Sequence, residues 1–123
     1  MKRILIAEDE NLIRSSLSQA LRKEGFLVVE AQNYREALER LEDKACDLAV
    51  VDLYLEDGMH GLNLIREVHR LSPAAKIIVT TAFGTEEIKE AAMKERIDCF
   101  YDKPFEIAEI KSAVRGLLQG TGS

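Results

Sequence analysis

Five short apolar runs are spaced along the chain, with polar stretches between them. They lie at 3–7, 27–29, 47–52, 76–80 and 99–101. Runs of this length that are apolar at consecutive positions and rich in valine and isoleucine are typical of strands buried on both faces of a parallel sheet. The third run is the clearest, because its four apolar residues end abruptly in the carboxylate of Asp52. The second run has only three residues, and we expect it to end at Glu30.

Between these runs, apolar residues recur at the spacing of a helix that faces a core. Gly25 marks the end of the first such helix, and Asn33 is suited to cap the second. Ser72-Pro73 closes the third, and Thr85 begins the fourth with two acids in its first turn, where the helix dipole favours negative charge. Five alternations of strand and helix predict an α/β fold, a doubly wound parallel sheet with helices on both faces.

The composition indicates one domain. The chain has 123 residues, enough to bury a core, and its 46% hydrophobic and 32% charged residues are ordinary for a globular protein. We expect this domain to span residues 1–119 and the glycine-rich residues 120–123 to be a short polar tail or the start of a linker. The net charge of −5 and the lack of a basic stripe argue against direct binding of nucleic acid.

No segment of the sequence resembles a signal peptide or a membrane span, because the apolar runs are too short for either. Cys46 and Cys99 lack the spacing of a metal or redox motif. We therefore expect a cytoplasmic protein with no membrane partner, in which both thiols are reduced and largely buried.

Acids end two of the expected strands. Glu8-Asp9 follows the first strand, and Asp52 ends the third. If these strands are neighbours where the winding of the sheet reverses, the three carboxylates converge on one crevice. Such a cluster repels itself unless a cation neutralises it, and oxygen ligands suit Mg²⁺. Taken singly, however, Asp52 is equally suited to ending a strand, and Glu8-Asp9 to capping a helix.

Two further polar side chains are expected at the same crevice. Thr81 and Lys103 follow the fourth and fifth strands. A hydroxyl donor, an ammonium, a divalent cation and an acceptor carboxylate together make a phosphoryl-transfer site. Lys103-Pro104 alone would also suit a turn. His60 and His69 have no third metal ligand nearby in the sequence, so surface positions are expected for both.

These motifs resemble those of the response-regulator receiver domains of two-component signalling, and the resemblance covers nearly the whole chain. In that family an acidic pair closes the first strand, here Glu8-Asp9, and the phosphoacceptor closes the third, here Asp52. A hydroxyl residue and alanine close the fourth, here Thr81-Ala82, and Lys103-Pro104 closes the fifth. Each motif alone is weak, but all four in order are highly specific. The resemblance implies a flavodoxin-like fold with strand order 2-1-3-4-5.

The resemblance further implies a phosphoacceptor and a metal site. Asp52 would accept a phosphoryl group from the phosphohistidine of a sensor histidine kinase or a phosphotransfer protein. Mg²⁺ would be held by Glu8, Asp9, Asp52 and the backbone carbonyl of Tyr54.

The remaining roles concern the phosphoryl group and the switch. Thr81, Ala82 and Lys103 would contact the phosphoryl group, while Thr81 and Phe100 would change position with its arrival. Pro104 would follow a cis peptide bond. An unknown effector would read the state on the face made by the fourth helix, the fifth strand and the fifth helix. The domain would thus be a switch rather than a dedicated enzyme.

The sequence departs from the family pattern in two places. The loop at 55–61 contains no proline and is one residue longer than usual, which leaves its conformation open. Arg96-Ile97 replaces the usual Gly-Ala pair after the fourth helix, so we expect that helix to be capped differently. Tyr54 and Phe83, each two residues past a site residue, are expected to flank the entrance to the site.

Three other functions are alternatives to that of a receiver. A haloacid-dehalogenase-like phosphatase needs a second acid two residues after its nucleophile, where this chain has Tyr54. A flavodoxin-like cofactor binder needs a phosphate loop after the first strand, where the acids at 8–10 would repel phosphate. A receiver-fold docking module that works independently of phosphorylation stays open, because an intact site does not exclude it.

Overall fold

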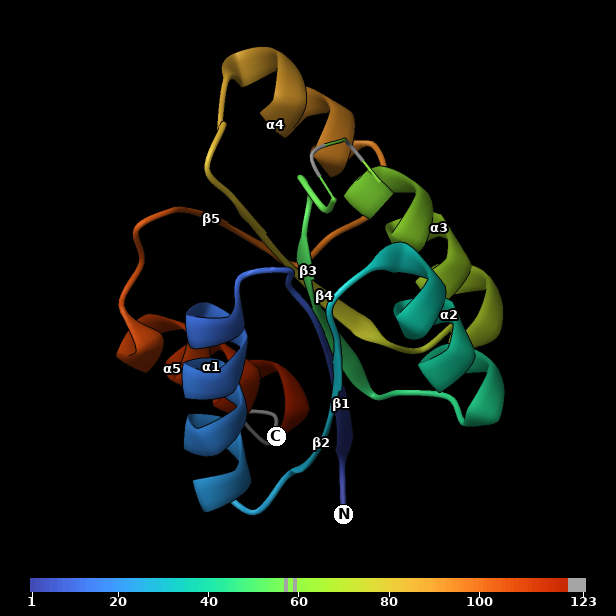
Figure 1. Ribbon diagram of the computed structural model, residues 1–123, viewed down its shortest axis with the longest axis vertical. Coiled ribbons are helices and arrows are strands. Elements are labelled where there is room, and N and C mark those ends of the chain that lie inside the picture. The colour runs from blue at the N-terminus through green and yellow to red at the C-terminus, as the bar shows by residue number, and fades with distance from the viewer. Residues whose placement is uncertain (57, 59, 120–123) are drawn as a thin grey trace.

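A central parallel sheet organises the computed structural model, which describes residues 1–56, 58 and 60–119 (Figure 1). Its strands are β1 Arg3–Ala7, β2 Leu27–Ala31, β3 Leu48–Asp52, β4 Lys76–Thr81 and β5 Cys99–Asp102. All neighbouring strands are parallel, and their order is β2-β1-β3-β4-β5. The expected flavodoxin-like, doubly wound α/β fold is confirmed.

The helices form a layer on each face of the sheet (Figure 1). They are α1 Asn11–Lys23, α2 Tyr34–Asp43, α3 His60–Leu71, α4 Glu86–Met93 and α5 Ile107–Leu118. Residues of α1 and α5 pack on one face with Ile4 and Ile6, and residues of α2, α3 and α4 pack on the other with Leu5 and Ala7. Alternate residues of β1 thus enter different cores, which explains why the strand is apolar at consecutive positions.

The expected helix starts are confirmed, and one strand boundary is corrected. The Asn33 side chain accepts a hydrogen bond from the Glu36 N–H, and Thr85 caps α4 in the same way through the Ile88 N–H. The expectation that β2 ends at Glu30 was wrong, because the strand continues to Ala31. The Glu30 carboxylate can stay within the strand because α1 neutralises it, with Arg14 Nε at 3.3 Å and Arg22 Nη1 at 3.4 Å.

The connection from α4 to β5 is capped without glycine. Arg96 takes a φ of 60°, in the left-handed region that glycine usually occupies at helix ends. Two contacts with His69 of α3 accompany this conformation: His69 Nε2 lies 2.7 Å from the Glu95 carbonyl oxygen, and Arg96 Nη2 lies 3.3 Å from His69 Nδ1. The unusual cap expected from Arg96-Ile97 is therefore confirmed.

Both cysteines are free. Cys46 is buried, which raises the pKa of its thiol, and Cys99 is half-buried. Among the described helices, none has both the length and the apolar character needed to cross a membrane.

Candidate functional site

The three carboxylates at the ends of β1 and β3 come together. One oxygen each from Glu8, Asp9 and Asp52 lies within 4.8 Å of the others. The adjacency of the strands produces this cluster, because Ala7 pairs with Val51 and the acids follow directly. Glu8 is 2% and Asp52 3% exposed, while Asp9 is half-buried. The expected convergence is therefore confirmed.

Lys103 reaches this cluster from the residue after β5. Its Nζ lies 2.8 Å from Glu8 Oε1 and 2.9 Å from Asp52 Oδ2, and its side chain is only 10% exposed. Burial lowers the pKa of Lys103, but hydrogen bonds to Glu8 and Asp52 outweigh burial, so that the pKa lies above its ordinary value. Lys103 therefore stays positively charged. The peptide bond between Lys103 and Pro104 is cis, as expected.

Lys103 alone does not balance the negative charge. Burial raises the pKa of the Glu8 carboxyl to about 7, the hydrogen bond from Lys103 opposes this rise, and the charge of Asp52 adds to it. Three acids around one ammonium leave room for a further cation. Because the donors are carboxylate oxygens, the site fits a hard divalent ion such as Mg²⁺ or Ca²⁺.

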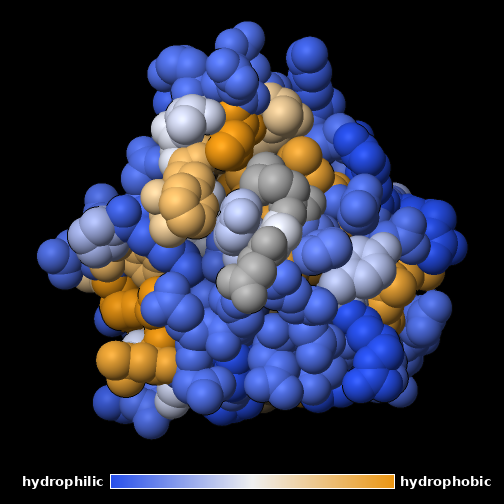
Figure 2. Space-filling view, turned by 45° about the horizontal axis from the view of Figure 1, so that its top comes forward, coloured by the Kyte–Doolittle hydropathy of each residue, from blue (hydrophilic) through white to orange (hydrophobic). Residues whose placement is uncertain are grey.

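Asp52 is fixed in place by a contact at each oxygen. Its Oδ1 accepts a hydrogen bond from the Tyr54 N–H at 2.9 Å, and its Oδ2 accepts from Lys103. The carboxylate borders an open pocket of about 330 Å³, which Asp9, Glu10, Tyr54, Ala82, Phe83 and Lys103 also line. Figure 2 turns this edge of the sheet forward and shows a mostly hydrophilic surface with smaller hydrophobic patches.

Thr81 ends β4, the strand beside β3, and is fully buried. Its Oγ1 accepts a hydrogen bond from the Phe83 N–H at 3.1 Å. A hydroxyl that accepts one bond keeps its own hydrogen for donation, so the Thr81 hydroxyl can still donate one hydrogen bond. Ala82 follows it and lines the pocket.

Tyr54 and Phe83 form an aromatic pair at the rim of the pocket. Their ring centroids are 4.8 Å apart and the planes are tilted by 54°, an arrangement that aromatic rings favour. Phe83 remains 53% exposed, so the pair covers the pocket only in part. Both residues were expected at the entrance, and the structure brings them into contact.

Phe100 lies away from the pocket, on the face of β5 that α4 covers. Its ring is half-buried against the same core cluster as Ile88 and Ala92 of α4, and Lys89 Nζ lies 5.9 Å from the ring centroid. The position suits the expected contact between β5 and α4.

Two acids that were not among the expected site residues also contact the site. Glu10 lines the pocket, and its Oε1 lies 3.4 Å from Lys103 Nζ. The N–H of Glu56 donates to Asp9 Oδ2 at 3.3 Å. Glu10 could have been suspected from its place beside Glu8-Asp9, but the contact of Glu56 depends on a loop whose path the sequence left open.

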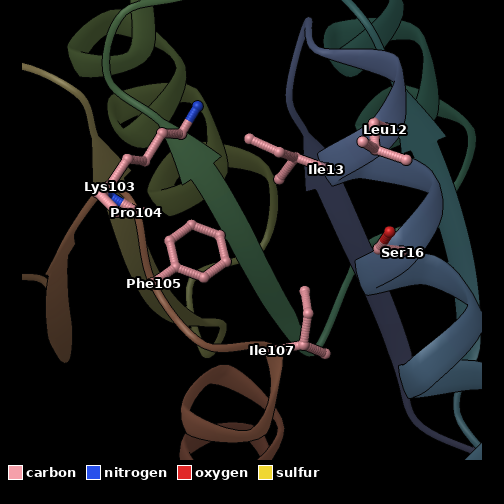
Figure 3. Close-up of a pocket in the computed structure, with 7 residues that line it drawn as sticks. All are labelled: Leu12, Ile13, Ser16, Lys103, Pro104, Phe105 and Ile107. Carbon is pink, nitrogen blue, oxygen red and sulfur yellow. The ribbon is translucent and has the colours of Figure 1, made fainter.

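A second cavity lies beside the site. The start of α1 and the turn after β5 enclose a mainly apolar groove of about 260 Å³. In Figure 3, the side chains of Ile13 and Phe105 face each other across it. Leu12 on its margin is 79% exposed.

Known proteins resemble this chain in sequence over almost its full length. Residues 4–115 match the family described as response regulator receiver domain. The chemotaxis protein CheY of Thermotoga maritima is 33% identical over 92% of this chain and 94% of its own length. The two-component response regulator PhoP of Pseudomonas aeruginosa is 35% identical over 95% of this chain, which spans only 52% of PhoP.

Solved structures agree with the sequence relatives. A CheY-like receiver domain protein from Methanospirillum hungatei has a TM-score of 0.89 and 30% identity, covering 97% of this chain and 94% of its own. A response regulator from Burkholderia pseudomallei, solved with a phosphorylated aspartic acid, a calcium ion and citrate, has a TM-score of 0.85 and 28% identity, covering 97% and 70%. The fold, the site and the matched residues together place this chain in the response regulator receiver domain family.

Proposed function

We propose that the chain is a phosphoryl-accepting receiver in which Asp52 is the acceptor. An oxygen of Asp52 attacks the phosphorus of a phosphohistidine on a sensor histidine kinase or phosphotransfer protein. The phosphorus–nitrogen bond breaks, and the departing imidazole takes up a proton. The observation that carries this proposal is the Asp52 carboxylate itself, 3% exposed, fixed by Tyr54 N–H and Lys103, and bordering an open pocket.

Glu8, Asp9, Asp52 and the backbone carbonyl of Tyr54 are the proposed ligands of Mg²⁺. When bound, Mg²⁺ supplies positive charge beside the phosphoryl oxygens. The crowding of the three carboxylates supports this assignment, because an anionic donor would otherwise meet net negative charge.

Lys103, Thr81 and Ala82 are proposed to hold the phosphoryl group once it has arrived. Lys103 already contacts Asp52 and can follow the new charge, while Thr81 can turn its hydroxyl hydrogen toward a phosphoryl oxygen. A hydrogen bond to a charged acceptor contributes about 1.5–3 kcal/mol. Inverting a 1:99 equilibrium needs about 5.5 kcal/mol, so Thr81 must act together with Lys103 and the metal.

The output is proposed to be a change in the face formed by α4, β5 and α5. Movement of Thr81 would open space for Phe100, whose ring already contacts the core beside α4. An effector that recognises this face would then bind one state better than the other. The protein would act as a switch, and its phosphorylation chemistry would serve that purpose rather than turnover of a substrate.

The test is incubation with acetyl phosphate and MgCl₂, followed by intact-mass analysis. We expect one added phosphoryl group, none with Asp52→Asn or Asp9→Ala, and none in excess EDTA. Asp43→Asn is the matched control, because Asp43 is an exposed aspartate on α2 with 82% of its side chain accessible. An unmodified wild-type protein would favour the docking module that works without phosphorylation. An unchanged rate in EDTA would exclude the proposed metal.

A further inference from the structure

Glu56 has an unusual backbone conformation in the loop after β3. Its φ is 54°, in the left-handed region that residues with a side chain seldom adopt. Proline, whose ring fixes φ near −65°, could not take this conformation. A proline at position 56 would therefore not permit the path that the loop follows.

The backbone of Glu56 contacts the acidic cluster. Its N–H donates a hydrogen bond to Asp9 Oδ2 at 3.3 Å, which joins residues 47 positions apart in the sequence. Asp9 is one of the three carboxylates that could hold a metal. Partners that hydrogen-bond to a metal ligand fix its orientation and influence the metal affinity.

The side chain of Glu56 contacts the start of α2. Its Oε1 accepts a hydrogen bond from the backbone N–H of Tyr34 at 2.7 Å. Tyr34 is the first residue of α2, so this N–H has no partner within the helix. The carboxylate also lies where the helix dipole favours negative charge. The cap residue Asn33 binds a different N–H, that of Glu36.

We propose that Glu56 is a positioning residue that orients Asp9 for Mg²⁺ and transmits the occupancy of the metal site to α2. The inference rests on the proposed function, since it assumes that Mg²⁺ binds at Asp9. The anchor on Tyr34 holds the Glu56 N–H against the Asp9 carboxylate. When Asp9 adjusts to the ion, the Glu56 backbone follows, and its side chain changes the hydrogen bond at Tyr34. The start of α2 thereby reports metal binding on a surface distinct from the α4–β5–α5 face.

The test is a titration of the whole ¹⁵N-labelled chain with MgCl₂, without a phosphoryl donor, followed by NMR. In the wild-type protein the Tyr34 amide is expected to shift along the same binding curve as the Asp9 amide. Glu56→Gln keeps an oxygen that can accept the hydrogen bond from the Tyr34 N–H. This variant should therefore retain the response of the Tyr34 amide to Mg²⁺ and the Mg²⁺ affinity. Glu56→Gly keeps the N–H but loses the anchor, so Mg²⁺ should bind up to about tenfold more weakly and the Tyr34 amide should stop responding.

Glu36→Gln is the matched control. It alters another carboxylate near the start of α2, which accepts from the Gln32 N–H and does not contact Asp9 in the structure. We expect this variant to bind Mg²⁺ as the wild type does, with a Tyr34 amide that still titrates.

The outcomes separate this inference from the proposed function. If the wild-type Asp9 amide does not respond to Mg²⁺, the metal site fails and the inference fails with it. If Asp9 responds but Tyr34 does not, the metal site stands and the inference alone is overturned. A Glu56→Gly protein with unchanged Mg²⁺ affinity, or with a Tyr34 amide that still titrates, would also overturn it.

Discussion

Close contacts with the backbone and with charged side chains determine where Asp52, the proposed acceptor, lies. Both oxygens of Asp52 accept hydrogen bonds, one from the Tyr54 N–H and one from Lys103. Lys103 Nζ lies 2.9 Å from Asp52 Oδ2 and 2.8 Å from Glu8 Oε1, so it links the two acids. Gly61, the second residue of α3, packs directly behind this strand end. Its N–H donates to the Leu53 carbonyl at 3.0 Å, and a Cβ on it would overlap the backbone of Asp52 and Leu53. The acceptor therefore depends on a residue without a side chain.

Gly61→Ala should destabilise the fold by about 1–3 kcal/mol, because the added methyl forces α3 and the end of β3 apart. Gly116→Ala in α5 is the control, since nothing lies within 4 Å of the added Cβ. That change should stabilise the protein by about 0.5–1 kcal/mol, as alanine suits a helix better than glycine. Urea denaturation of both variants and of the wild type would measure the changes in the free energy of unfolding. Equal effects of the two substitutions would contradict the packing argument.

The aromatic pair of Tyr54 and Phe83 is expected to slow hydrolysis of the phosphorylated Asp52. The two rings lie at the pocket rim with centroids 4.8 Å apart, and we expect them to restrict the approach of water. Replacing both by alanine should therefore speed dephosphorylation several-fold, whereas Tyr54→Phe, which keeps the ring, should not. Decay of phosphoprotein mass after removal of the donor would measure this. An unchanged or slower decay in the double variant would reject the idea.

At the scale of elements, α4 is attached to the sheet less firmly than α3. Ala92 is the one buried residue among the eight of α4, whereas α3 buries Gly61, Leu64, Ile65 and Val68. A helix with few buried contacts can shift at low cost, which suits the proposed output face. Its C-terminal end is tied to α3 by the contact of Arg66 Nη2 with Glu95 Oε2 at 3.0 Å and by His69.

Arg96→Gly should stabilise the connection after α4. Arginine at a φ of 60° bears a conformational cost that glycine does not, so a gain of up to about 1 kcal/mol is expected. Arg96→Lys, which keeps the strain but loses the contact to His69, should give no gain. Thermal unfolding would compare the stabilities of the two variants with that of the wild type. A glycine variant less stable than the wild type would mean that the His69 contact outweighs the strain.

The ion pair between α1 and α5 should make stability depend on pH. A hydrogen bond from Arg115 lowers the pKa of the Glu24 carboxyl, with burial opposing it and the charges of Arg115 and Lys111 assisting. A carboxyl with a lowered pKa stabilises the fold above its unfolded pKa, and this contribution is lost as the pH falls through the folded value. Between about pH 6 and pH 3, the wild type should therefore lose more stability than Glu24→Gln. Urea denaturation at several pH values would measure this, and an equal loss of stability in the two proteins would contradict it. High salt should reduce the difference between the wild type and Glu24→Gln, because it screens the ion pair.

At the scale of the whole molecule, β4 lies between β3, which carries Asp52, and β5, which carries Phe100 of the proposed output face. Thr81 pairs with Asp102 at the end of β5, and Phe100 pairs with Val79 of the same strand that carries Thr81. The acceptor pocket and the α4–β5–α5 face are thus joined through β4. The apolar groove between α1 and the turn after β5 shares Lys103 with this pocket.

Beryllofluoride, a mimic of the phosphoryl group, is expected to change the NMR signals of Phe100 and of α4 as well as those around Asp52. Phe100 is already half-buried and lacks a hydroxyl, so packing alone should set its position and the change should be partial. Asp52→Asn is the control and should give no shifts. Shifts limited to the loops around Asp52 in the wild type would exclude output through this face.

The convergence of Glu8, Asp9, Asp52 and Lys103 could be inferred from the sequence once the strands were ordered as the family resemblance implies. Buried parallel strands produce continuous apolar runs, and their carboxyl ends share one edge of the sheet. The apolar runs alone do not give the order of the strands, which the resemblance supplied. The helix starts at Asn33 and Thr85 could also be predicted from the sequence, because a cap residue binds a backbone N–H only a few residues away.

Other features were decided by the tertiary structure, because they depend on contacts between distant residues. Glu30 stays in β2 only because Arg14 and Arg22 of α1 neutralise it. The left-handed conformation of Glu56 is accompanied by hydrogen bonds to Asp9 and Tyr34, which lie 47 and 22 positions away. Local propensity favours neither arrangement, since an acid inside a strand and a side chain at positive φ are both unfavourable by themselves. The sequence by itself determined which groups meet at the sheet edge, and the packing of distant elements decided how they are held there.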